Sequence, residues 1–148
     1  MQLFLVHHGE AVGAEIDPRR PLSERGREQA ERVAAEAASR GARPAVVWHS
    51  GKLRAKQTGE AFWRATNPLA EFAATRDVQP DDPPEWIRDR LRAETRDIAI
   101  AGHFPHLPCL VELLLGGVRD FPSHGVVALA TDDEGDTWRE LWRIETSN

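Results

Sequence analysis

The stretch MQLFLVHHGE, residues 1–10, indicates the architecture of the chain. It begins with an apolar run that ends at Val6 and changes abruptly to two histidines, a glycine and a glutamate. A short apolar run without alternation, followed by a glycine turn, predicts a strand that is covered on both faces. Strands of this kind are typical of parallel sheets that carry helices on each side.

The rest of the chain repeats this alternation of strands and helices. We expect further strands within residues 44–50, 70–78 and 97–103, helices within residues 23–41, 53–66, 84–94 and 105–117, and a hairpin over residues 126–144 that turns near Asp133 to Gly135. The pattern predicts one domain over residues 1–148, an α/β fold with a mostly parallel sheet between two helical layers, a three-layer α/β/α sandwich.

Composition narrows the class of protein. A net charge of -5 without a basic face argues against nucleic-acid binding. The one cysteine, Cys109, excludes an intramolecular disulfide and favours a reducing compartment. Cys109 lies in an apolar helical stretch, so we expect it to be buried.

The first apolar run is too short for a signal peptide, and no run reaches the roughly 18 residues of a membrane helix. We therefore expect a soluble cytoplasmic protein.

Polar residues follow three of the predicted strands. His8 comes after the first run, Ser50 and then Arg54 after the second, and His103 after the third. Ligands of open α/β sheets bind outside the carboxyl ends of the strands. These four side chains are therefore expected to lie at one edge of the sheet.

Four segments in this order resemble the histidine phosphatase superfamily, which has the phosphoglycerate-mutase-like fold. HHGE, residues 7–10, stands where the family has Arg-His-Gly-Glu, and PLSERGREQA, residues 21–30, is similar to its Pro-Leu-Thr-x-x-Gly helix start. SGKLRAKQT, residues 50–58, and GHFPHL, residues 102–107, resemble two further family segments. The short chain resembles the SixA-type phosphohistidine phosphatase branch in particular.

The resemblance implies a phosphatase that transfers a phosphoryl group to His8 and then to water. Neutral imidazole is a competent nucleophile when an acceptor holds the proton on its other nitrogen. Arg54 and His103 are the implied phosphate contacts, and Ser50 either joins them or caps the helix of Arg54. Arg20 lies in the loop before the first helix and is either a further phosphate contact or simply solvated. Asp77 stands where the family has a carboxylate before a proline and is the candidate general acid, with Asp81 and Asp82 as alternatives.

His7 departs from the family, which has arginine at this position. Arginine is permanently charged, whereas histidine is mostly neutral at pH 7. Losing one charged contact is expected to cost about 2–4 kcal/mol of transition-state stabilisation. Two outcomes remain open. Either a bound phosphate dianion protonates His7 and activity survives with a preference for mildly acidic pH, or the chain is a degenerate member that binds phosphorylated ligands or a partner with little turnover.

Two other classes of protein, a metalloenzyme and an interaction module, are alternatives to the phosphatase. The histidines and Glu10 offer donors for a metal site, but adjacent histidines on a strand point to opposite faces, so we expect no metal and no cofactor. A pure interaction module is the second rival, because five tryptophans are many for this length. The expected partner is a phosphorylated protein or a small phosphorylated substrate, and the sequence does not indicate an oligomeric state.

Overall fold

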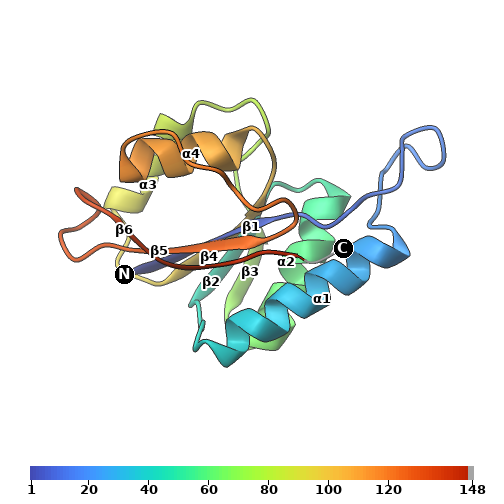
Figure 1. The fold of residues 1–148 in the computed structure, drawn as a ribbon, viewed down its shortest axis with the longest axis horizontal. Coiled ribbons are helices and arrows are strands. Elements are labelled where there is room, and N and C mark those ends of the chain that lie inside the picture. The colour runs from blue at the N-terminus through green and yellow to red at the C-terminus, as the bar shows by residue number, and fades with distance from the viewer. Residues whose placement is uncertain (147–148) are drawn as a thin grey trace.

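The computed structural model describes residues 1–146, in which six strands form one sheet between two layers of helices (Figure 1). The elements in chain order are β1 (Gln2–His7), α1 (Glu24–Ser39), β2 (Val46–His49), α2 (Leu53–Thr66), β3 (Glu71–Ala74), α3 (Pro84–Arg92), β4 (Ile98–Gly102), α4 (His106–Leu115), β5 (Val126–Ala130) and β6 (Arg139–Ile144).

The sheet has the order β3-β2-β4-β1-β5-β6. Strands β3, β2, β4 and β1 are parallel to their neighbours, while β5 is antiparallel to β1 and β6 is antiparallel to β5. The mostly parallel sheet and the final hairpin are therefore confirmed. Since Val126 pairs with Val6, the chain just before β5 lies beside the end of β1.

Alternate residues of the central strands are buried on opposite faces of the sheet. Leu3 and Leu5 belong to a core cluster that includes residues of α3 and α4, and Phe4 and Val6 to a second cluster that includes residues of α1 and α2. Figure 1 shows α3 and α4 on one side of the sheet and α1 and α2 on the other. This confirms the three-layer sandwich and explains why β1 reads as a continuous apolar run.

The helix boundaries follow local signals in the sequence. The Ser23 side chain accepts a hydrogen bond from the Gly26 amide and caps α1, and Pro84 occupies the first turn of α3. The expectation that Cys109 is buried is wrong, because this residue is exposed on α4. The apolar stripe of α4 runs through Leu107, Leu110, Val111 and Leu114, and position 109 lies off that stripe. Among residues 1–146, no helix is long and apolar enough to cross a membrane.

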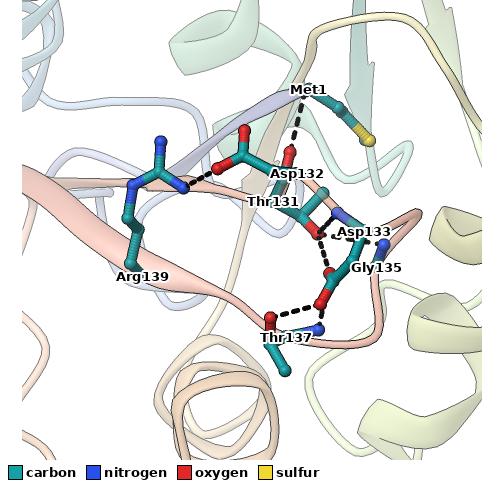
Figure 2. Close-up of polar contacts among 7 residues, drawn as sticks. All are labelled: Met1, Thr131, Asp132, Asp133, Gly135, Thr137 and Arg139. Carbon is teal, nitrogen blue, oxygen red and sulfur yellow. Dashed lines mark hydrogen bonds and ion pairs between the residues drawn. The ribbon is translucent and has the colours of Figure 1, made fainter.

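The hairpin turn between β5 and β6 is organised by Asp133 (Figure 2). Its carboxylate accepts hydrogen bonds from the hydroxyl of Thr131 and from the amide and hydroxyl of Thr137. The Thr131 hydroxyl also accepts from the amide of Gly135, and the Thr131 carbonyl accepts from the N-terminal amine of Met1. The hairpin therefore closes through side chains at the edge of the sheet that is opposite to the histidines at the end of β1.

Candidate active site

The polar residues that follow β1, β2 and β4 meet at one edge of the sheet, as the sequence predicted. Strand β4 lies between β1 and β2 and all three run in the same direction. The hydroxyl oxygen of Ser50 is 2.6 Å from Nε2 of His103, and the ring centroids of His8 and His103 are 5.2 Å apart.

The His8 ring is held in one tautomer by the turn that follows it. Its Nδ1 lies 2.7 Å from the carbonyl oxygen of Gly9. Because a carbonyl oxygen only accepts, Nδ1 carries the hydrogen and Nε2 keeps its lone pair. Burial lowers the pKa of His8 to about 4. The hydrogen bond to Gly9 acts in the opposite direction and raises this pKa, whereas the charge of Arg54 lowers it further. The ring is therefore neutral at pH 7 and able to attack.

The turn after His8 requires glycine for a steric reason. A Cβ atom at Gly9 would collide with the backbone carbonyl of Gly26 at the start of α1. The Gly9 amide donates to the hydroxyl of Thr58, 3.1 Å away, and that hydroxyl donates to the carbonyl of Arg54 at 2.8 Å. These contacts fix the His8 turn to both α1 and the first turn of α2.

His103 is buried and neutral beside His8. Its Nε2 shares a hydrogen bond with Ser50, and its Nδ1 has no hydrogen-bond partner among the described residues. Burial, with smaller effects of His8 and other nearby charges, lowers the pKa of His103 to about 3. Ser50 also accepts from the amide of Lys52 at 3.3 Å, so it contacts both His103 and the residue before α2. The start of α2, whose N-cap residue is Lys52, has no side-chain cap among the described residues, so the capping role considered for Ser50 is wrong. Its role as a phosphate contact stays a prediction.

Two arginines lie near His8 without counter-ions. Arg54 is the second residue of α2, and Arg20 lies in the loop that the Ala11–Leu22 bridge closes. Their charges act on each other and both lower the pKa of His8. Burial, and then the charge of Arg20, lower the pKa of Arg54. Within residues 1–146 neither arginine forms an ion pair, and the buried Nε of Arg54 has no partner. Unpaired positive charges of this kind are suited to an anion.

His7 is buried at the end of β1 and cannot easily become charged. The amide of His124 donates to Nδ1 of His7 at 2.7 Å, so Nδ1 is an acceptor and the hydrogen lies on Nε2. The ring stacks on Phe104, with centroids 3.9 Å apart and planes 8° apart. Burial, and then the neighbouring histidines, lower the pKa of His7 to about 2. His7 therefore offers one neutral donor where the family has an arginine.

His124 belongs to this cluster and the sequence analysis missed it. Its Nδ1 lies 2.7 Å from the carbonyl oxygen of His8, and its ring is stacked on His7 at 4.9 Å. Sequence reasoning considered only residues that follow strands. His124 precedes β5, which is antiparallel to β1, so the start of β5 reaches the same edge. The sequence contained one signal for the role of His124, namely its place just before the apolar run of residues 126–130.

Asp77 lies apart from the histidines. Its carboxylate pairs with Arg90 at 3.4 Å, and Arg90 also donates to the carbonyl of Arg76. The nearby residues Gln79 and Asp82 are the ones that reach the site: Nε2 of Gln79 donates to the carbonyl of Ser50 at 2.7 Å, and the amide of Gln79 donates to Asp82 at 3.0 Å. Of the three candidate acids, Asp82 is the one connected to Ser50 through these contacts.

The described residues 1–146 contain no group of three or more His, Cys, Asp or Glu side chains placed to hold a metal ion. His49 accepts a hydrogen bond from the Gly51 amide. His106 is buried at the start of α4, and neither of its ring nitrogens has a partner among these residues. The cluster of imidazoles around His8 is thus held by backbone hydrogen bonds and stacking.

A groove of about 580 Å³ runs between α1 and α2. Leu53, which precedes Arg54, lines it together with Gln57 and, on α1, Ala30 and Glu31. The amide oxygen of Gln57 accepts from the amide of Leu22 at 2.7 Å and so anchors the end of the Arg20 loop to α2. Arg20, Arg54 and the histidines around His8 do not line this groove.

Similar folds occur among phosphatases of known structure. The chain is similar to the protein histidine phosphatase SixA in a complex with tungstate, with 23% identity, coverage of 98% of this chain and 97% of the other, and a TM-score of 0.87. It is similar to a SixA-type phosphohistidine phosphatase from Agrobacterium tumefaciens, with 24% identity, coverage of 99% and 98%, and a TM-score of 0.83. A mycobacterial glucosyl-3-phosphoglycerate phosphatase matches with 15% identity, coverage of 99% of each chain, and a TM-score of 0.72.

The likenesses in fold do not by themselves assign the chain to a family, whereas a comparison of sequences does. No curated protein matches the chain significantly. The sequence model of the histidine phosphatase superfamily (branch 1) matches residues 3–79, which is more than half of the chain and includes His8, Arg20, Ser50 and Arg54. The chain belongs to the histidine phosphatase superfamily.

Proposed function

We propose that this protein is a phosphohydrolase that works through a phosphohistidine intermediate on His8. The observation that carries the proposal is the pairing of a neutral His8, whose Nε2 is free to attack, with the unpaired charges of Arg54 and Arg20. Phosphoryl transfer needs a positioned nucleophile and positive charge around the equatorial oxygens, and these residues meet both needs.

The reaction has two steps. In the first, Nε2 of His8 attacks phosphorus, an N–P bond forms, and the bond from phosphorus to the leaving group breaks. In the second, a water oxygen bonds to phosphorus and the N–P bond breaks, which releases inorganic phosphate and restores His8. Arg54 and Arg20 neutralise the phosphoryl oxygens in both steps, and His103 adds a hydrogen bond.

A protein-borne phosphohistidine or a small phosphorylated compound is the proposed substrate. An imidazole leaving group departs readily from phosphorus, so turnover of a phosphohistidine does not depend on a carboxylate as proton donor. The likeness in fold to SixA-type phosphohistidine phosphatases supports the same substrate class. A cytoplasmic setting, predicted from Cys109, stays a prediction.

A degenerate member that binds phosphorylated ligands with little turnover is the second candidate. One observation favours it: His7 is held neutral, so the site lacks the permanent charge of the family arginine. The protein would then bind phosphate through Arg54 and Arg20, and the chemical step would be slow.

Rapid quench with labelled phosphoramidate separates these candidates. We expect the wild type to release phosphate and to carry a transient label, and His8→Ala to do neither. His49→Gln is the matched control, because His49 follows a neighbouring strand and bonds only the Gly51 amide among the described residues. Phosphate binding without any label on the wild type would establish the degenerate alternative.

A further inference from the structure

His124 is fixed at the site by two hydrogen bonds, both of which it donates to the residues at the end of β1. Its backbone amide donates to Nδ1 of His7, and its ring Nδ1 donates to the carbonyl of His8, each over 2.7 Å. The ring is parallel to that of His7 within 10°, at a centroid distance of 4.9 Å, and its centroid is 6.4 Å from that of His8. The residue adopts a left-handed backbone conformation, with φ of 57°.

These bonds decide which of the two stacked rings is able to take up a proton. Nδ1 of His7 is an acceptor, so protonation there would break its bond to the His124 amide. Nδ1 of His124 already carries its hydrogen, because it faces a carbonyl oxygen. The lone pair of His124 lies on Nε2, which has no hydrogen-bond partner among the described residues. His124 therefore accepts a proton without the loss of any bond within the protein.

The other rings of the cluster remain neutral. Burial lowers the pKa of His7 to about 2, that of His8 to about 4 and that of His103 to about 3. His124 is less buried than His7, and its charge acts on both His7 and His8. A phosphate dianion bound at His8 would lie within the same short range and would favour the protonated form of His124.

We propose that His124, as an imidazolium, supplies a third cationic phosphate contact in place of the charge that His7 cannot carry. This inference rests on the proposed function, because it places the phosphoryl group at His8. The titratable groups in contact with His124 are His7 and His8 at the end of β1. Arg54 on α2 and Arg20 in the loop act on the neighbouring His8. Binding of the anion brings an opposite charge to His124 and so stabilises the imidazolium.

Binding of tungstate at several pH values tests the proposal without any turnover. Tungstate remains a dianion between roughly pH 6 and pH 8, the range in which histidines titrate. Calorimetry on the wild type is expected to show tighter binding as the pH falls through this range. His124→Asn is the matched variant, since asparagine tolerates a positive φ and its amide is able to donate to the His8 carbonyl, but it cannot become charged.

The variant is expected to bind tungstate about ten- to a hundredfold more weakly at roughly pH 6 and to lose the pH dependence. Nitrogen-15 spectra of the tungstate complex of the wild type should show both ring nitrogens of His124 protonated. Unchanged affinity of a folded variant, a retained pH dependence, or a neutral His124 in the complex would each overturn the proposal.

Two further measurements separate this proposal from the proposed function. His7→Arg in the His124→Asn background is expected to restore tungstate affinity at roughly pH 8, because it returns a permanent charge to the site. Absence of restoration would argue that His124 acts through geometry and not through charge. Labelling of His8 by phosphoramidate in the wild type is scored independently. A wild type that labels normally alongside an unaffected His124→Asn variant would reject the role of His124 alone.

Discussion

The hydroxyl oxygen of Ser50 lies 2.6 Å from Nε2 of His103, and both residues are buried. Replacing Ser50 with alanine would leave this nitrogen without its partner in a dry environment. We expect Ser50→Ala to lower the free energy of unfolding by about 1–3 kcal/mol. Turnover should fall by about tenfold or more, because the ring of His103 is no longer held in place. Urea unfolding and steady-state kinetics measure the two effects.

Ser39→Ala is the control for this substitution. Ser39 is exposed at the end of α1 and donates only to the carbonyl of Glu36. Its replacement is expected to change stability by less than about 0.5 kcal/mol and to leave turnover intact. Equal effects of the two substitutions would mean that the Ser50–His103 contact does not hold the site.

Arg54 is expected to reduce stability while it supports catalysis. Its partly buried cation lies near Arg20 and pairs with no carboxylate in residues 1–146. Arg54→Met should therefore raise the free energy of unfolding by about 0.5–2 kcal/mol in phosphate-free buffer. Turnover should fall by about 10²–10³-fold, as when one oxyanion donor is removed. Thermal unfolding and phosphate release are the two measurements.

Arg64→Met on the same helix provides the comparison. Arg64 is exposed and pairs with Glu60 at 2.8 Å. Loss of this surface pair should cost about 0.3–0.5 kcal/mol and leave turnover unchanged. Added tungstate should raise the unfolding temperature of this variant and of the wild type, but not that of Arg54→Met. A destabilised Arg54→Met variant that still binds tungstate would contradict the role given to Arg54.

Much of the fold could be predicted because the helix caps and apolar runs of the sequence coincide with the elements and the buried core of the structure. The apolar runs of β1 and β4 are buried on both faces, the Ser23 cap starts α1, and the predicted helix over residues 53–66 coincides with α2. The meeting of His8, Ser50 and His103 followed from a general rule for parallel sheets. These inferences needed only strand direction and hydrophobic pattern.

Features that depend on the partners of a side chain could not be predicted in this way. His124 reaches the site because β5 runs antiparallel, and a sequence does not state the direction of pairing. The tautomer of His7 depends on the His124 amide, which is distant in the sequence. Asp77 pairs with Arg90 from α3, a contact that a motif alignment does not contain. To predict that Cys109 is exposed, one would need to know which face of α4 carries the apolar stripe.

The position of the general acid can be tested with a pair of isosteric changes. Asp82 is connected through Gln79 to Ser50, whereas Asp77 pairs with Arg90. We expect Asp82→Asn to slow hydrolysis of an alkyl phosphate by about a hundredfold and to spare phosphoramidate, because only the alcohol leaving group needs a proton. Asp77→Asn should affect neither substrate and should lower stability by at most about 1 kcal/mol. The reverse pattern would identify Asp77 as the acid.

Acidification is expected to destabilise the fold well above the range in which its carboxylates titrate. Burial lowers the pKa of His7 to about 2, that of His8 to about 4 and that of His103 to about 3. In the unfolded chain each ring takes up a proton near pH 6.5, so below that pH the unfolded state binds more protons than the folded state. Stability that is complete above about pH 6.5 is therefore lost as the pH falls toward the folded pKa values. The slope reaches at most about 1.4 kcal/mol per pH unit for each histidine, and less for the partly exposed His8.

Urea unfolding at roughly pH 7 and pH 5 measures this loss, and two variants assign it. In His7→Gln an amide oxygen is able to accept from the His124 amide but takes up no proton, so stability should fall less between the two pH values than in the wild type. Asp133→Asn is the control, because hydrogen bonds from Thr137 lower the pKa of Asp133 to about 2. The contribution of Asp133 is present above about pH 4 and is lost only as the pH falls toward 2, so this variant should be destabilised equally at both pH values. A His7→Gln variant with the same pH dependence as the wild type would show that His7 is not held neutral by the fold.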